Sequence, residues 1–227
     1  MHLAFKLELD KTSALELPSF EPEEIDFWLN AAITRFVKTR YTGSDKGVGF
    51  EGNMKRMEDL RSLITEDILL PAMAGTMRSN SWIYDTSPFS GERWFILGEE
   101  VDIEYVKLGE TNISTKRQGI TECTTLTYRA HIDDPYSEHI LHYEEAKPLR
   151  LIYGECVELI TDGNYEPTKY YIRYLNRPAV VSLTGLADCN LPIHTHDEIV
   201  VLATNMVLEN IEQPRYQTHS NELNKNE

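Results

Sequence analysis

The spacing of apolar positions changes along this 227-residue chain. Toward both ends, apolar residues recur every three to four positions, which is typical of a helix with one buried face. This pattern predicts helices over 22–40, 50–64 and 196–211. The first opens with a proline and acidic residues and ends with basic ones, which suits the dipole of a helix. The first two segments together are expected to form a helical hairpin.

The middle of the chain instead shows short runs of β-branched and aromatic residues separated by turn residues. Residues 101–105 and 170–174 alternate between apolar and polar side chains, which predicts strands of an antiparallel sheet with one buried face. The predicted strands are 82–84, 93–97, 101–108, 124–131, 149–159, 170–174 and 180–183. Strands and helices do not alternate, which argues against a doubly wound parallel sheet.

The expected fold class is therefore α+β. The N- and C-terminal helices are expected to pack as a bundle, with an antiparallel β region inserted between them. The predicted divisions are 1–80 for an N-terminal helical hairpin, 81–191 for the β-rich region, 192–213 for a C-terminal helix that packs on the N-terminal helices, and 214–227 for a polar tail. The tail has few apolar residues to bury, so we expect it to be disordered.

Composition narrows the class of protein. The chain has 22 Lys and Arg against 37 Asp and Glu, a formal net charge of −15. Such a charge argues against a protein that grips nucleic-acid phosphates or anionic lipid, since both depend on basic side chains. No segment approaches a membrane span and the N-terminus does not resemble a secretion signal, so a soluble protein is expected. Cys123, Cys156 and Cys189 form no CxxC pair and are expected to be free thiols.

Two segments contain residues that could bind a metal. His194, His196 and Asp197 are close in sequence, but they straddle a predicted helix start, where the two imidazoles should point apart. The segment 131–142 suits a divalent ion better because it combines imidazoles with carboxylates. Its candidates are His131, Asp133, Asp134, Glu138, His139 and His142. A solvated loop is the competing interpretation of this segment.

Signatures of other chemistry are missing from the sequence. It contains no GxSxG nucleophile motif and no phosphate-binding P-loop. We therefore predict no catalytic, cofactor-binding or metal-binding residue and no cofactor. A chain of this size without concentrated reactive groups favours a subunit of an assembly over an enzyme. The alternatives are a metal-dependent hydrolase or nuclease that uses the 131–142 loop, and an assembly chaperone or scaffold.

Two helical blocks resemble a known group of proteins. The first block is EEIDFWLNAAITRFVKTRYTG followed by GVGFEGNMKRMEDLRSLI, and the second is LPIHTHDEIVVLATNMVLENIEQPRYQT. Both resemble ring or adaptor-type tail (neck) structural proteins of crAss-like bacteriophages. The matching letters in the first block are Asn30, Arg35, Phe36, Tyr41, Phe50, Glu51, Arg56, Leu60 and Arg61. Those in the second are Leu191, Pro192, His194, Thr195, His196, Glu198, Ile199, Leu208, Glu209, Pro214, Arg215 and Tyr216.

This resemblance implies a virion protein that forms an oligomeric ring, expected to be a dodecamer, in the tail or neck below the portal. A protein of this kind is similar in plan to the head-to-tail adaptor and tail-tubular proteins of short-tailed phages. The implied partners are other copies of the chain, the portal or neighbouring tail ring proteins, and, transiently, viral DNA passing through a channel. The implied location is the virion, after synthesis in the cytoplasm of the host bacterium. The resemblance carries no catalytic residues.

Overall fold

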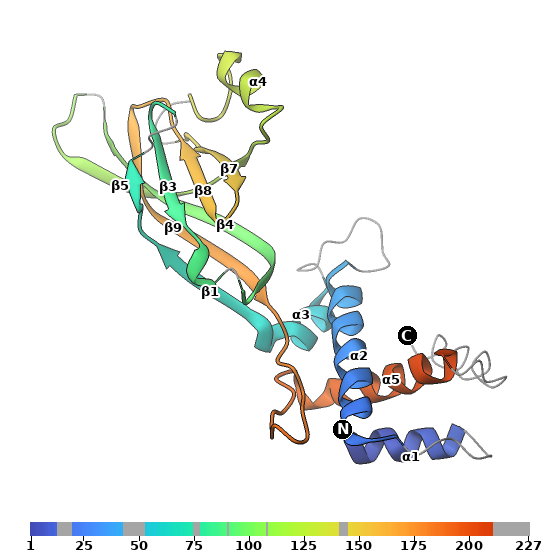
Figure 1. Ribbon diagram of the computed structural model, residues 1–227. Helices are drawn as coiled ribbons and strands as arrows, with labels where there is room; N and C mark the ends of the chain where they lie inside the picture. The colour runs from blue at the N-terminus through green and yellow to red at the C-terminus, as the bar shows by residue number, and fades with distance from the viewer. Residues whose placement is uncertain are drawn as a thin grey trace. The chain divides into compact units, whose positions relative to one another are not determined.

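The computed structural model describes residues 1–12, 20–42, 53–74, 78–89, 91–107, 109–140 and 145–210. They divide into two compact units, shown in Figure 1. The helical unit comprises 1–63 and 178–227, and the β unit comprises 64–177. The helical unit is thus built from both ends of the chain, whereas the β unit is one continuous segment. This division places the unit boundaries at residues 63/64 and 177/178, whereas the sequence pattern suggested 80/81 and 191/192.

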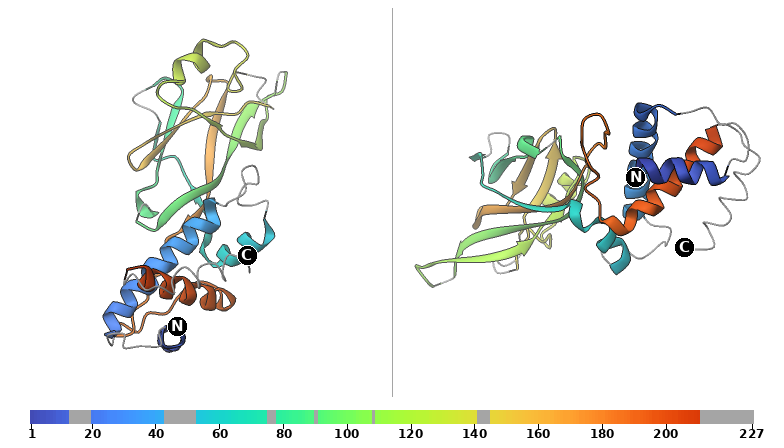
Figure 2. Two further views of the ribbon diagram at one scale, coloured as in Figure 1. Left: turned by 90° about the vertical axis from the view of Figure 1, so that its right-hand side faces the viewer. Right: turned by 90° about the horizontal axis from the view of Figure 1, so that it is seen from below.

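The described helices of the helical unit are α1 (His2–Thr12), α2 (Pro22–Thr42), α3 (Met54–Leu60) and α5 (His196–Asn210), with single turns of 3₁₀ helix at η2 (Arg61–Leu63) and η4 (Ile193–Thr195). The predicted helix over 22–40 is confirmed, and the one over 196–211 is confirmed as far as residue 210. Helix α5 contacts both α2 and α1, and α1 contacts α2 (Figure 2). None of the helices described is both long and apolar enough to cross a membrane.

The apolar stripe of α2 is buried as its spacing predicts. Ile25, Leu29, Ile33 and Phe36 are all at most 3% exposed. Helix α5 turns a somewhat different face inward than predicted, because Val200 and Leu208 are buried while Leu202 and Met206 are only partly so. The buried side chains of α1 are Phe5 and Leu9, four positions apart and therefore on one face of the helix.

The helix expected over 50–64 is shorter in the structure. Its residues 50–52 lie outside the described part of the chain, the α-helix ends at Leu60, and residue 64 already begins a strand. The apolar spacing of 60–64 fits either element, so tertiary pairing decides it. Ile64 pairs with Leu175, more than a hundred residues away.

The β unit contains two sheets. The first has the order β1-β9-β4-β5 and every neighbouring pair is antiparallel. Its strands are β1 (Ile64–Leu69), β4 (Arg93–Val106), β5 (Ile113–Gly119) and β9 (Tyr165–Asn176). The second has the order β2-β3-β8-β7-β6, in which only the short β6–β7 pair is parallel. Its strands are β2 (Met73–Ala74), β3 (Ser81–Asp85), β6 (Thr121–Glu122), β7 (Leu149–Tyr153) and β8 (Cys156–Ile160).

The two sheets pack face to face around a core rich in tyrosine. Tyr84 and Leu159 from the second sheet share one apolar cluster with Val101, Tyr170 and Ile172 from the first. In 101–105 and 170–174 the predicted inward positions are buried, because alternate side chains of a strand point to opposite faces. The fold class is thus α+β with antiparallel sheets, as predicted.

Other strand predictions need correction. The segment 124–131 is a turn followed by the short helix α4 (Tyr128–Asp133), and 180–183 contributes only a single bridge, from Ser182 to Ala187. The predicted strands 93–97 and 101–108 merge into β4, while 149–159 splits at a turn where Gly154 has φ of 57°. Strands β1 and β5 and helix α1 were not predicted. A single 3₁₀ turn, η3 (Ser87–Phe89), completes the described elements.

Candidate interface residues

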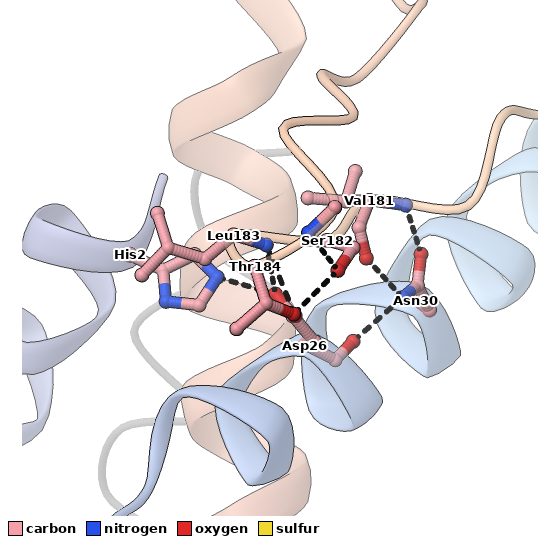
Figure 3. A network of polar contacts seen from close by, with 8 residues as sticks. His2, Asp26, Asn30, Val181, Ser182, Leu183 and Thr184 are labelled. Atoms are coloured by element: carbon pink, nitrogen blue, oxygen red, sulfur yellow. Dashed lines mark hydrogen bonds and ion pairs between the residues drawn. The ribbon is translucent and has the colours of Figure 1, made fainter.

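Two polar links connect distant parts of the helical unit, and the first joins α2 to the segment that follows the β unit (Figure 3). The Asn30 side chain donates to the Val181 carbonyl and accepts from the Val181 N–H, both at 2.8 Å. The Asp26 carboxylate accepts from the Leu183 N–H at 3.1 Å and lies 2.5 Å from His2 Nε2 on α1. These contacts fix the backbone of residues 181–183 against α2.

The second link joins α2, α3 and the start of α5. Arg40 Nε lies 3.0 Å from Asp59 Oδ2, and a second nitrogen of the same guanidinium pairs with Glu198. The other oxygen of Asp59 lies 3.0 Å from His194 Nε2. Arg40 also stacks over the ring of Phe36, 4.9 Å from its centroid. Asp59 is 3% exposed, so its charge depends on these partners for compensation.

This network accounts for the sequence cluster at 194–198. His194 contacts Asp59, whereas His196 Nε2 lies 3.1 Å from the Leu191 carbonyl, so the two imidazoles have separate partners. Thr195 and Glu198 have the spacing of a helix capping box, but Thr195 donates to the Pro192 carbonyl and Glu198 pairs with Arg40. Within the described ranges, no three His, Cys, Asp or Glu side chains are placed to hold a metal ion.

The segment 131–142 has local partners for most of its candidate metal ligands. Asp134 accepts the Tyr136 N–H at 2.9 Å in a turn, and Asp133 faces Arg129 at 3.7 Å. His139 is buried, its Nδ1 lies 2.9 Å from the Ser137 hydroxyl, and burial lowers the pKa of its imidazole. Glu138 accepts from Thr121 at 2.7 Å, a hydrogen bond that lowers the pKa of its carboxyl group. His142 lies outside the described residues.

Tyrosine hydroxyls of the β core find acceptors. Tyr84 donates to the Pro167 carbonyl at 3.0 Å, Tyr174 donates to Asp67 at 2.6 Å, and Tyr170 donates to Glu99. Burial raises the pKa of all three phenols, so each remains a neutral donor. A tyrosine-rich sheet therefore serves here as a packed core, as the low basic content suggested. The cysteines in this structure are free thiols, as predicted.

Ion pairs also involve strands β7 and β8 of the second sheet. Arg150 pairs with Glu99 and, at 3.1 Å, with Glu122, and burial lowers the pKa of the Arg150 guanidinium. Glu158 is fully buried and pairs with Arg78. Each buried carboxylate thus has a guanidinium partner, which is the arrangement of a structural ion pair and assigns no chemical step to these groups.

Both units also expose large apolar side chains. In the helical unit, Leu3 and Leu7 lie on the outward side of α1, and Leu186 is 90% exposed at a turn where its φ is 51°. In the β unit, Ile113 and Leu70 are each about two-thirds exposed. Single exposed apolar residues are ordinary on a soluble surface, but they are also where contacts with other subunits are built.

The sequence contained a signal for part of this network. Arg40 follows Phe36 and Val37 by four and three positions, so it continues the apolar stripe of α2 with a charged residue. A charge on a buried stripe requires an opposite charge nearby, yet the sequence does not say which one. Asn30, His194 and Glu198 belong to the matching letters of the crAss-like resemblance, and in the structure each links segments distant in sequence.

Comparison with known proteins supports a phage ring protein. No protein-family model matches the chain. The chain is 27% identical over 176 residues to a protein of Bacteroides phage crAss001 named Ring protein 4/5, an alignment that covers 75% of this chain and 68% of that protein. Because the helical unit spans only 1–63 and 178–227, so long an alignment must include part of the β unit. The likeness therefore reaches beyond the two helical blocks.

Proposed function

We propose that this chain is a structural ring protein of a bacteriophage virion and catalyses no reaction. The observation that carries the proposal is the similarity to Ring protein 4/5 of phage crAss001. The structure adds a consistent physical picture. The ion pairs described above link helices or strands to one another, as Arg40 does with Asp59 and Arg78 with Glu158.

The proposed position is the tail or neck below the portal, where the ring would form part of the DNA channel between capsid and tail. Its partners would be other copies of the chain, about twelve in a ring, together with the portal or adjacent tail ring proteins. The net charge of −15 supports this role, because an acidic wall repels phosphate and allows DNA to slide. We assign the mature protein to the virion and its synthesis to the host cytoplasm.

Each part of the chain would have a separate task in such a ring. We propose that α1, α2 and α5 act as one bundle that fixes the N- and C-terminal parts of each copy together. The contacts of α5 with both other helices support this assignment. The β unit would supply a second interaction surface, and the polar tail 214–227 would order against a neighbouring ring.

Two measurements test the proposal. Mass spectrometry of purified virions should detect the chain, and electron microscopy of the same particles should place it in a ring around the channel axis. A chain absent from finished particles would instead support a chaperone or scaffold. Mapping acidic residues on the ring tests the channel assignment, because a basic lumen would contradict it.

A further inference from the structure

The first sheet of the β unit ends in two edge strands of opposite charge. In the order β1-β9-β4-β5, each edge strand has one hydrogen-bonded neighbour among the described strands. Strand β1 carries Glu66 and Asp67 without a basic residue, whereas β5 carries Lys116 and Arg117 without an acidic one. A sheet edge offers a row of backbone donors and acceptors to another strand. Resting on the proposed ring function, we propose that β5 of one copy pairs with β1 of the next.

The strand directions allow this pairing to repeat around a ring. Each step from β1 to β9, β4 and β5 is antiparallel, so β1 and β5 run in opposite directions. Copies related by rotation about an axis along the strands keep those directions. Strand β5 of one copy therefore meets β1 of the next as an antiparallel neighbour. A contact between two different edges is head-to-tail, the kind of contact that closes into rings.

A single register satisfies both pairs of charges. Placing Lys116 opposite Asp67 also places Arg117 opposite Glu66, because residue numbers run in opposite senses along antiparallel strands. The sheet faces agree as well. Lys116 and Asp67 lie on the face of the sheet that packs against the core, because their cross-strand partners are core residues. Arg117 and Glu66 lie on the opposite face. Within one copy, Arg117 lies 3.2 Å from Asp102 and Asp67 accepts a hydrogen bond from Tyr174, so each pair between copies would extend an existing polar contact.

The same register also matches exposed apolar residues. It sets Ile113 of β5 opposite Leu70, just beyond β1, and these side chains are 68% and 67% exposed. It sets Thr115 opposite Ile68, and both of these side chains are exposed too. Directly opposed side chains stabilise an antiparallel pair, and the apolar area removed from water adds to this.

The charges also oppose the wrong pairings. Two copies of β5 placed side by side would bring basic residues together, and two copies of β1 would bring carboxylates together. Like charges directly opposite one another destabilise a strand pair. The two edges therefore favour each other over themselves, which selects a ring over a two-fold dimer.

A disulfide cross-link tests both the pairing and its register. In the double variant Thr115→Cys with Ile68→Cys, the new thiols should lie opposite each other across the contact, where Cα atoms are about 4.5–5.5 Å apart. Within one copy, β1 and β5 are separated by three strand spacings, about 14 Å, too far for a disulfide. Oxidised rings, whether of the purified full-length chain or in phage particles, should give a ladder of covalent oligomers on a non-reducing gel.

The controls separate this inference from the proposed function. A mixture of the two single variants should stop at covalent dimers, and Thr115→Cys with Ile64→Cys, offset by four residues or about 13 Å, should not cross-link. The unsubstituted chain measures the background from its native cysteines. Rings that form without a ladder, or dimers of Thr115→Cys alone, would overturn the edge pairing and leave the ring function standing. A chain that forms no ring and is absent from virions would contradict the ring function itself.

A charge variant provides a second readout. Lys116→Glu would place two carboxylates opposite each other, so the ring fraction seen by mass photometry should fall at least tenfold. Lys55→Glu makes the same change of charge on exposed α3 and should leave the ring fraction unchanged. An equal effect of the two variants would contradict a specific role for the β5 edge.

Discussion

The helical unit and the β unit depend on different interactions. In the helical unit, polar contacts connect segments from opposite ends of the chain: Arg40 to Glu198, Asp59 to His194 and Asn30 to Val181 span 158, 135 and 151 positions. In the β unit, which is one continuous segment, buried tyrosine rings fill the core, and the Tyr84 hydroxyl donates to the Pro167 carbonyl within it. Both units have an apolar core, but polar contacts specify which segments meet in the helical unit, whereas tyrosine rings supply much of the packed volume of the β unit.

The largest expected effect is a loss of stability in the β unit alone. Tyr170→Ala removes a fully buried ring whose centroid lies 5.3 Å from that of Tyr84, and should cost about 3–5 kcal/mol in the free energy of unfolding. Hydrogen exchange read by mass spectrometry should show lost protection in β4, β8 and β9 with little change in α2. Tyr170→Phe retains the ring and should cost much less. Equal loss of protection in both units would contradict separate stabilisation.

The next effect falls on the helical unit. Arg40→Met leaves the buried Asp59 carboxylate without its guanidinium, which should cost about 3 kcal/mol. Chemical denaturation followed by circular dichroism at the helix wavelength measures it. Arg35→Met, on the exposed side of the same helix, is the matched control and should change stability by less than about 0.5 kcal/mol. Similar losses in the two variants would mean that the ion pair contributes nothing specific.

A smaller and more local effect is expected at α2. Asn30→Ala removes both hydrogen bonds to Val181 and should cost about 1–2 kcal/mol. Amide exchange at 179–184 should accelerate while the middle of α5 stays protected. Asn30→Asp retains an acceptor for the Val181 N–H but opposes two oxygens at the carbonyl, so it should not rescue the loop. If Asn30→Asp restored the protection of residues 179–184, the hydrogen bond from the Val181 N–H alone would hold this segment.

The smallest effect is a pH dependence confined to the β unit. Burial lowers the pKa of His139, so the unfolded chain binds this proton more readily than the folded one. Its contribution to stability is complete above the unfolded pKa of about 6.5 and declines as the pH falls toward the folded pKa, with a slope below about 1.4 kcal/mol per pH unit. Comparing the chain with His139→Gln isolates this slope from that of the carboxylates. Parallel pH profiles for the two proteins would contradict it.

The sequence pattern predicted elements well where one period was long and unbroken. Helix α2 and the inward positions of β4 and β9 followed from spacing alone. The pattern failed for short elements. Ile64, the first residue of β1, was assigned to the end of a helix because Leu60 and Ile64 fit both periods, and the rest of β1 was not assigned. The segment 124–131 was assigned to a strand although it contains the start of α4. In six-residue elements, pairing with a distant strand outweighs local preference.

The polar links of the helical unit and the charged edges of the first sheet could be predicted only in part. The matching letters Asn30, His194 and Glu198 pointed to important positions, but their partners Val181, Asp59 and Arg40 were not assigned. The acidic and basic edges of the first sheet were invisible because neither β1 nor β5 was expected as a strand. Edge charge has meaning only once the order of strands is known.

By itself, the sequence determined the α+β class, the acidic character and the absence of familiar catalytic motifs, because each of these depends on composition or on spacing within one segment. Only the tertiary structure decided which charges meet, where the helical unit begins and ends, and which strands form the sheet edges. These properties depend on contacts between separate elements, such as Arg40 with Glu198 and Ile64 with Leu175, and local periodicity carries no information about such contacts.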